Sequence, residues 1–255
     1  MTAAQEYRWE ARVQYQMSRV LAGPVLRLLW RPEVVGTENI PASGGAILAS
    51  NHLSIVDSIF LPLMVDRPVT FAAKSEYFTG TRLIDRVAGT YLRATKQLSV
   101  DRAEARAGQD MLEAALRLLQ SGELFGIYPE GTRSPDGRLY RGRVGIGWLA
   151  LNSGLPVLPV AMSGTDRVLP PGQKIPRVAK IGITIGKPLT FEKYQDLPSA
   201  SRQRRAITDD VMQSIQALSG QEYVPMYASV RKEELAAASN GARPGRSARS
   251  AGRRE

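Results

Sequence analysis

Apolar residues along the chain fall into short runs separated by longer amphipathic stretches. Six runs have the length and composition of buried strands, at residues 44–50, 68–73, 96–100, 124–128, 156–162 and 179–186. Helix-like segments stand between several of them, and the clearest spans residues 103–120, where apolar side chains recur on one face. Strands that alternate with helices are typical of a mixed, largely parallel sheet flanked by helices, so the pattern predicts an α/β fold.

The first 32 residues differ from the rest. Between Tyr7 and Trp30, aromatic and aliphatic residues interleave with four arginines, a pattern typical of an amphipathic helix in the headgroup region of a membrane. We expect a break near Gly23 and Pro24. A helix packed against its own domain would show the same pattern, so both interpretations stay open. No run of 18 apolar residues occurs, and no transmembrane helix is predicted.

Composition sets the domain organisation. With 255 residues and 43% hydrophobic content, the chain can build one sizeable domain, which we place at residues 33–230. We expect residues 231–255 to form a disordered basic tail, because their last twenty positions hold five Arg against one Glu and are rich in Gly, Ser and Ala. The rest of the formal charge of +10 favours anionic partners, either lipid headgroups or phosphorylated ligands.

The same composition excludes several kinds of chemistry. Without cysteine the chain has no thiolate nucleophile and no cysteine-bound metal. One histidine argues against a multi-histidine metal site, so no metal and no cofactor are expected. No nucleic-acid-binding motif is present, and no nucleic-acid partner is expected.

The only histidine, His52, lies in the stretch NHLSIVD, between a predicted strand and a predicted helix. α/β proteins often place reactive groups on such turns, and an imidazole is suited to proton transfer near neutral pH. Asp57 follows five residues later and is a candidate partner for the ring. The alternative is a capping box, in which Ser54 caps the helix and Asp57 reaches back to a backbone N–H. Both interpretations stay open on this segment alone.

A second block, IYPEGTRS at residues 127–134, ends another predicted strand in a turn-rich loop. With it the chain resembles the glycerolipid acyltransferases of the 1-acyl-glycerol-3-phosphate (lysophosphatidic acid) acyltransferase type. The marks of that family are an H-x-x-x-x-D motif, here His52 to Asp57, and a Pro-Glu-Gly-Thr-Arg block, here residues 129–133. Three further blocks stand in order, FAAKSEYF at 71–78, QLSVDR at 97–102 and LPVLPVAMSGT at 155–165. The resemblance covers roughly residues 33–225.

The resemblance implies an activity. It implies transfer of a fatty acyl group from acyl-CoA or acyl-carrier protein to 1-acyl-glycerol-3-phosphate, giving phosphatidic acid in phospholipid biosynthesis. It also implies an anionic membrane surface as a partner and a peripheral location on the cytoplasmic face of the cell membrane. Glycerol-3-phosphate or another lysophospholipid is the alternative acceptor, and a noncatalytic lipid-binding protein is the alternative of another class.

The resemblance also implies roles for single residues. His52 would be the general base and Asp57 would orient its ring. The residues implied for the acceptor phosphate are Arg102, Glu130, Gly131, Thr132 and Arg133. Glu130 would hold the arginines or satisfy backbone N–H groups of its own turn. Further candidates for substrate binding are Asn51, Lys74, Arg141 and Arg143.

Overall fold

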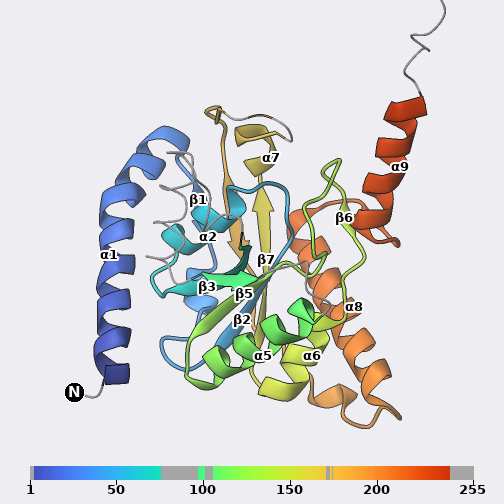
Figure 1. Cartoon of the computed structure of the whole chain (residues 1–255), viewed down its shortest axis with the longest axis horizontal. Coiled ribbons are helices and arrows are strands. Elements are labelled where there is room, and N and C mark those ends of the chain that lie inside the picture. Colours follow the sequence, from blue (N-terminus) through green and yellow to red (C-terminus); the bar gives the residue numbers. More distant parts are fainter. Residues whose placement is uncertain (1–2, 76–96, 101–105, 171–172, 174, 242–255) are drawn as a thin grey trace, which may run out of the picture.

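The computed structural model describes residues 3–75, 97–100, 106–170, 173 and 175–241. Its main sheet has seven strands in the order β1-β8-β7-β2-β5-β3-β4. Every neighbouring pair in it is parallel except β7 with β8. The predicted mixed, largely parallel sheet flanked by helices is therefore confirmed (Figure 1).

The strands of this sheet are β1 (Glu33–Val35), β2 (Ala46–Ser50), β3 (Val69–Lys74), β4 (Leu98–Val100), β5 (Leu124–Ile127), β7 (Val157–Ser163) and β8 (Gly182–Ile185). A small parallel pair joins β6 (Leu139–Tyr140) to β9 (Tyr223–Val224). The helices are α1 (Ala3–Trp30), α2 (Asp57–Met64), α5 (Ala107–Gln120), α6 (Gly145–Ser153), α7 (Thr165–Val168), α8 (Ala200–Ser219) and α9 (Ala228–Gly241), with 3-10 turns at Thr37–Asn39 and Glu192–Tyr194. All six predicted strands are present, whereas β1, β6 and β9 are too short for a sequence pattern to reveal.

Strand β2 lies at the centre of the sheet and divides the core into two layers. Ala46 and Leu48 pack on the side of α2, and Ile47 and Ala49 pack on the side of α5, α6 and α8. The alternation follows from the two-residue period of a strand. All five residues of β2 are buried, as expected for a central strand covered by helices on both faces.

Helix α1 lies along one side of the molecule and contacts α2 (Figure 1). It is continuous through Pro24, so the predicted break near Gly23 and Pro24 is wrong. A proline removes one hydrogen bond and crowds the preceding turn, which bends a helix that other contacts hold in place. Figure 1 shows the helix changing direction toward its C-terminal end.

The predicted boundary of the C-terminal tail is also wrong, because residues 231–241 continue helix α9. The expected disorder of residues 242–255 concerns positions outside the described part of the chain. Low content of large apolar residues suggested a tail, but α9 is docked by polar contacts with loops that are distant in sequence.

Candidate active site

His52 and Asp57 lie in and directly after the loop that leaves the carboxyl end of β2. The ring atom Nδ1 of His52 is 2.9 Å from Oδ2 of Asp57. A carboxylate only accepts hydrogen bonds, so Nδ1 is the donor, and in the neutral form of the ring the lone pair is on Nε2. The His52 side chain is 15% exposed, whereas Asp57 is fully buried. This geometry orients a neutral imidazole as a proton acceptor.

Asp57 also organises the backbone of the turn. The same oxygen, Oδ2, accepts the backbone N–H groups of Leu53 and Ser54, both at 2.8 Å. The backbone contact expected for a capping box therefore exists together with the histidine contact. Ser54 does not cap the helix, since its hydroxyl donates to the carbonyl of Leu169 and α2 begins at Asp57 without a side-chain cap.

Aromatic stacking holds the imidazole from one side. The ring of Tyr128 lies parallel to that of His52, with centroids 3.8 Å apart and planes 10° apart. Phe71 stacks on Tyr128 in turn, at 5.1 Å. The Tyr128 hydroxyl is hydrogen-bonded to Ser58 at 2.9 Å. Tyr128 thus restricts rotation of the imidazole, a role that the sequence did not predict although it immediately precedes the Pro-Glu-Gly-Thr-Arg block.

The peptide groups on both sides of His52 are held by the second block. The N–H of His52 donates to Oε2 of Glu130 at 3.1 Å, and its carbonyl accepts the N–H of Ser134 at 2.7 Å. The other oxygen of Glu130 accepts the N–H of Tyr140 at 3.0 Å. The loops after β2 and β5 are therefore joined at the histidine, because both strands end at the same edge of the sheet.

Glu130 has a different role from the one implied by the resemblance. It is 1% exposed, and both carboxylate oxygens are used by backbone N–H groups outside its own turn. Burial raises the pKa of the Glu130 carboxyl to about 7, against the lowering effect of the two N–H donors. The side chain positions the histidine loop and is not available to a ligand.

Of the remaining residues of this block, Gly131 and Arg133 are exposed and Thr132 is half-buried. Gly131 has φ of +72°, a left-handed conformation that favours glycine, and a Cβ there would come within 2.9 Å of the Arg143 side chain. The hydroxyl of Thr132 accepts a hydrogen bond from Lys232 at 2.6 Å. Arg133 is exposed and has no charged partner in the described part of the chain. A free guanidinium of this kind is suited to a phosphate group.

Arg141 and Arg143 follow strand β6. Their guanidinium groups approach the ring of Tyr227 at 5.7 and 5.2 Å. Arg143 is exposed, its N–H donates to the carbonyl of Pro129, and its guanidinium reaches the Ser229 hydroxyl at 3.3 Å. The structure thus brings Arg143 onto Gly131, while the sequence alone did not connect Tyr227 with either arginine.

Asn51 is fully buried and its amide is already used. The side chain exchanges two hydrogen bonds with the backbone of Met162 on β7, at 2.7 and 2.9 Å, and also donates to Gln221 at 2.7 Å. Gln221 donates to the carbonyl of Gly137. We therefore infer that Asn51 connects β2 with β7 and, through Gln221, with the loop at residues 134–138. This structural role replaces the predicted contact with substrate.

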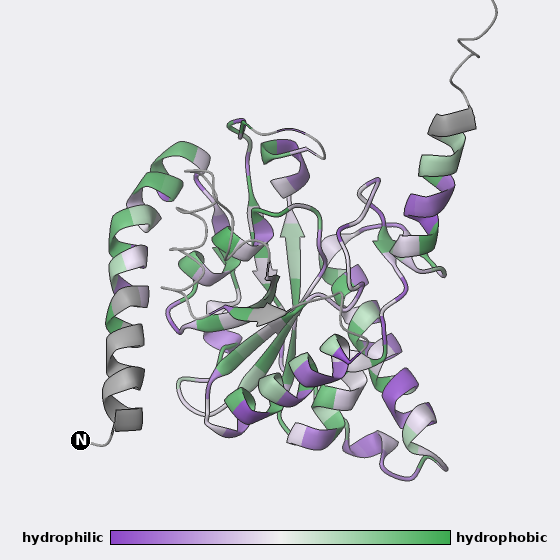
Figure 2. Ribbon diagram, viewed as in Figure 1, coloured by the Kyte–Doolittle hydropathy of each residue, from purple (hydrophilic) through white to green (hydrophobic). Residues whose placement is uncertain are grey.

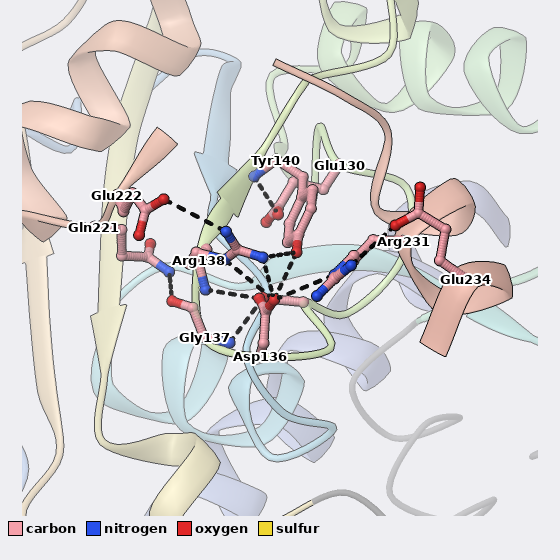
Figure 3. Close-up of polar contacts among 10 residues, drawn as sticks. Glu130, Asp136, Gly137, Arg138, Tyr140, Gln221, Glu222, Arg231 and Glu234 are labelled. Carbon is pink, nitrogen blue, oxygen red and sulfur yellow. Dashed lines mark hydrogen bonds and ion pairs between the residues drawn. The ribbon is translucent and has the colours of Figure 1, made fainter. Parts of the chain in front are cut away.

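Asp136 connects that loop to its surroundings (Figure 3). Its carboxylate accepts hydrogen bonds from Arg138 at 2.7 Å and from the Tyr140 hydroxyl at 2.8 Å, and lies 3.9 Å from Arg231 of α9. The cluster fixes the far end of the loop that begins with Glu130. Neither its composition nor its spacing identified it in the sequence.

Two predicted residues cannot be placed with the others. Arg102 lies outside the described residues, and Lys74 ends β3 at the carboxyl edge of the sheet, with only its backbone described. Among the residues that the structure describes, no group of three or more metal-ligating side chains is close enough together to hold a metal ion.

Comparisons with known proteins agree on one kind of relative. Residues 31–163 match a family model described as Acyltransferase. The 1-acyl-sn-glycerol-3-phosphate acyltransferase of Bacillus subtilis (strain 168) is 31% identical over 196 residues, which are 76% of this chain and 91% of that protein. A chloroplastic protein of the same name from Brassica napus is 26% identical over 201 residues.

The match covers 78% of this chain and 57% of the Brassica protein, so the chain spans little more than half of that relative. Among solved structures, the crystal structure of the 1-acyl-sn-glycerophosphate acyltransferase PlsC from Thermotoga maritima superposes with a TM-score of 0.60. The two are 26% identical, and the superposition covers 80% of this chain and 79% of that one.

Proposed function

The chain belongs to the acyltransferase family, and on that premise we propose that it transfers a fatty acyl group from a thioester donor to the free hydroxyl of 1-acyl-glycerol-3-phosphate, forming phosphatidic acid. The observation that carries the proposal is the arrangement of His52. Its Nδ1 is fixed by Asp57, its ring by Tyr128 and its peptide groups by Glu130 and Ser134.

The chemistry follows from this arrangement. Nε2 of His52 takes the proton of the acceptor hydroxyl while the oxygen attacks the thioester carbonyl. Asp57 stabilises the imidazolium that forms. When the tetrahedral intermediate collapses, the carbon–sulfur bond breaks, and the departing thiolate receives the proton from His52. No acyl-enzyme is needed, which suits a chain without cysteine.

The acceptor's phosphate would bind beside the histidine. In 1-acyl-glycerol-3-phosphate the hydroxyl and the phosphate stand on neighbouring carbons, so the phosphate must lie within a few bonds of the reacting oxygen. Arg133 and Arg143 are exposed cations at the loop that holds the His52 peptide. Guanidinium groups match phosphate oxygens in two-point contacts. Acyl-CoA and acyl-carrier protein remain the two proposed donors.

We further propose that α1 attaches the protein to the cytoplasmic face of the cell membrane. One face of α1 packs on the domain through Tyr15, Ala22 and Leu26, and Trp30 contacts Phe60 edge-on with ring centroids 5.8 Å apart. The outward face exposes large apolar side chains, listed here with their exposed fractions: Met17 57%, Val20 69%, Leu21 69%, Val25 53%, Leu28 74% and Leu29 45%. In Figure 2 the green colour of hydrophobic residues recurs along the C-terminal half of α1.

Such a stripe suits a helix lying in the interface between headgroups and acyl chains. The exposed Arg27 and Arg31 near its end would contact anionic lipid. None of the helices in the described ranges combines the length and the apolar composition that crossing a bilayer requires. On this proposal both interpretations of the segment hold, because one face of α1 packs on the domain and the opposite face contacts lipid.

Purified protein tests the proposal with a panel of acceptors and donors in liposomes. We expect phosphatidic acid from 1-acyl-glycerol-3-phosphate with at least one thioester donor. Preferred acylation of glycerol-3-phosphate or of another lysophospholipid would identify that compound as the acceptor instead. Binding of lipid without transfer to any acceptor would favour a noncatalytic lipid-binding protein.

A further inference from the structure

Helix α9 lies outside the residues that match the family model, yet it contacts the loop beside the histidine. Nζ of Lys232 donates to the Thr132 hydroxyl at 2.6 Å. Thr132 is the residue between Gly131 and Arg133. A cation from the C-terminal helix is therefore held on the Pro-Glu-Gly-Thr-Arg loop.

The position of α9 is set by contacts other than Lys232. Arg231 pairs with Glu234 at 2.9 Å within the helix and lies 3.9 Å from Asp136 on the loop (Figure 3). At the start of the helix, Ser229 contacts Arg143 at 3.3 Å. Because these contacts dock the helix, loss of the Lys232 charge should leave its position unchanged.

The charges around Lys232 favour an anion. Arg133 directly follows Thr132, the residue that Lys232 contacts. The side chain of Arg143 passes over Gly131. Of the nearby carboxyl groups, Asp136 is paired with Arg138, and Glu130, which lies within range of the Lys232 charge, accepts two backbone N–H groups. The Thr132 hydroxyl is a neutral acceptor for the Lys232 ammonium group.

We propose that Lys232 binds the phosphate of the acceptor, together with Arg133 and Arg143, and this inference rests on the proposed function. The contacts that connect Lys232 with the histidine loop support it. Lys232 bonds to Thr132, and Glu130, two residues before Thr132, accepts the His52 N–H directly. A phosphate held there would place the hydroxyl on the neighbouring carbon close to the imidazole. The C-terminal helix thus completes the acceptor site.

Two substitutions test the proposal. Lys232→Met keeps the aliphatic stem and the helix propensity but removes the charge. We expect it to raise KM for 1-acyl-glycerol-3-phosphate roughly 10-fold or more, as for loss of a charge-assisted hydrogen bond, with KM for the donor unchanged. Lys232→Arg should restore most of the acceptor affinity. Lys187→Met is the matched control, because Lys187 is exposed after β8, whose carboxyl end lies at the opposite edge of the sheet.

A binding measurement separates this site from the proposed function. We expect inorganic phosphate and glycerol-3-phosphate to raise the thermal unfolding midpoint of the wild type, and to raise that of Lys232→Met much less. Unchanged acceptor KM and unchanged phosphate protection in Lys232→Met would overturn the proposal. Equal increases of both KM values with a lowered unfolding midpoint would overturn it too, by showing that Lys232 only docks α9. Lys232-dependent phosphate protection without acyl transfer would contradict the proposed function and support the phosphate site.

Discussion

Replacement of Asp57 by Asn separates the two roles of this carboxylate. Three donors converge on Oδ2, namely Nδ1 of His52 and the backbone N–H groups of Leu53 and Ser54. Oδ1 is buried and has no hydrogen-bond partner among the described residues. In Asp57→Asn the two backbone donors therefore select the orientation with the amide oxygen at the Oδ2 position. The turn and the Nδ1–H tautomer of His52 are preserved, and only the negative charge is lost.

The size of the effect follows from Coulomb's law. A carboxylate and an imidazolium about 4 Å apart attract each other by about 4 kcal/mol at an effective dielectric constant of about 20. Loss of that attraction in the transition state corresponds to a decrease in kcat of about 10²- to 10³-fold. The buried amide NH₂ has no acceptor, so we also expect the free energy of unfolding to fall by about 1–3 kcal/mol.

Steady-state kinetics and urea unfolding of three variants measure both effects. We expect Asp57→Asn to keep both KM values while kcat falls. Asp57→Ala removes the acceptor of three donors and should lose much more stability than Asp57→Asn. Near wild-type kcat in a folded Asp57→Asn protein would refute the catalytic role and leave only the capping role. A decrease in kcat as large as that of His52→Ala would show that the tautomer is lost as well.

Further outcomes are expected at other positions. Arg133→Ala should raise KM for the acceptor more than KM for the donor, and Arg133→Lys should not restore it fully; equal effects on both substrates would contradict the phosphate role. Glu130 has a folded-state pKa of about 7 against an ordinary value of 4.5, so its contribution to stability is fully present below about pH 4.5 and is lost as the pH rises through about 7. The loss is about 3 kcal/mol, and urea unfolding at about pH 4 and about pH 8 should show it in the wild type but not in Glu130→Gln. Leu28→Glu, on the outward face of α1, should reduce flotation with anionic liposomes without lowering stability, whereas a stability loss with unchanged flotation would assign that face to packing.

The sequence predicted those features of the site that depend on neighbouring residues. Strand-helix alternation located His52 and the Pro-Glu-Gly-Thr-Arg block at strand ends, and β2 and β5 proved to be adjacent and parallel. Asp57 follows His52 by five positions, a spacing that a turn before a helix can close. Local pattern was sufficient in these cases.

Features that depend on contacts between distant segments could not be predicted. Glu130 meets the His52 N–H 78 residues away, and Asn51 meets Met162 and Gln221 at separations of 111 and 170 residues. Lys232 lies in a segment whose composition indicated disorder, and only its contact with Thr132, 100 residues away, assigns it to the site. No periodicity records such pairs, because side-chain partners are set by the packing of the whole sheet.

We propose that His52 accepts the proton of a lysophosphatidic acid hydroxyl during acyl transfer. It is tested most directly by following a radiolabelled acyl group from acyl-CoA or acyl-carrier protein into phosphatidic acid, with purified wild type and His52→Ala in liposomes. We expect product with the wild type and none above background with His52→Ala, whose fold and acceptor binding remain intact. Turnover by His52→Ala above a small fraction of the wild-type rate would contradict it.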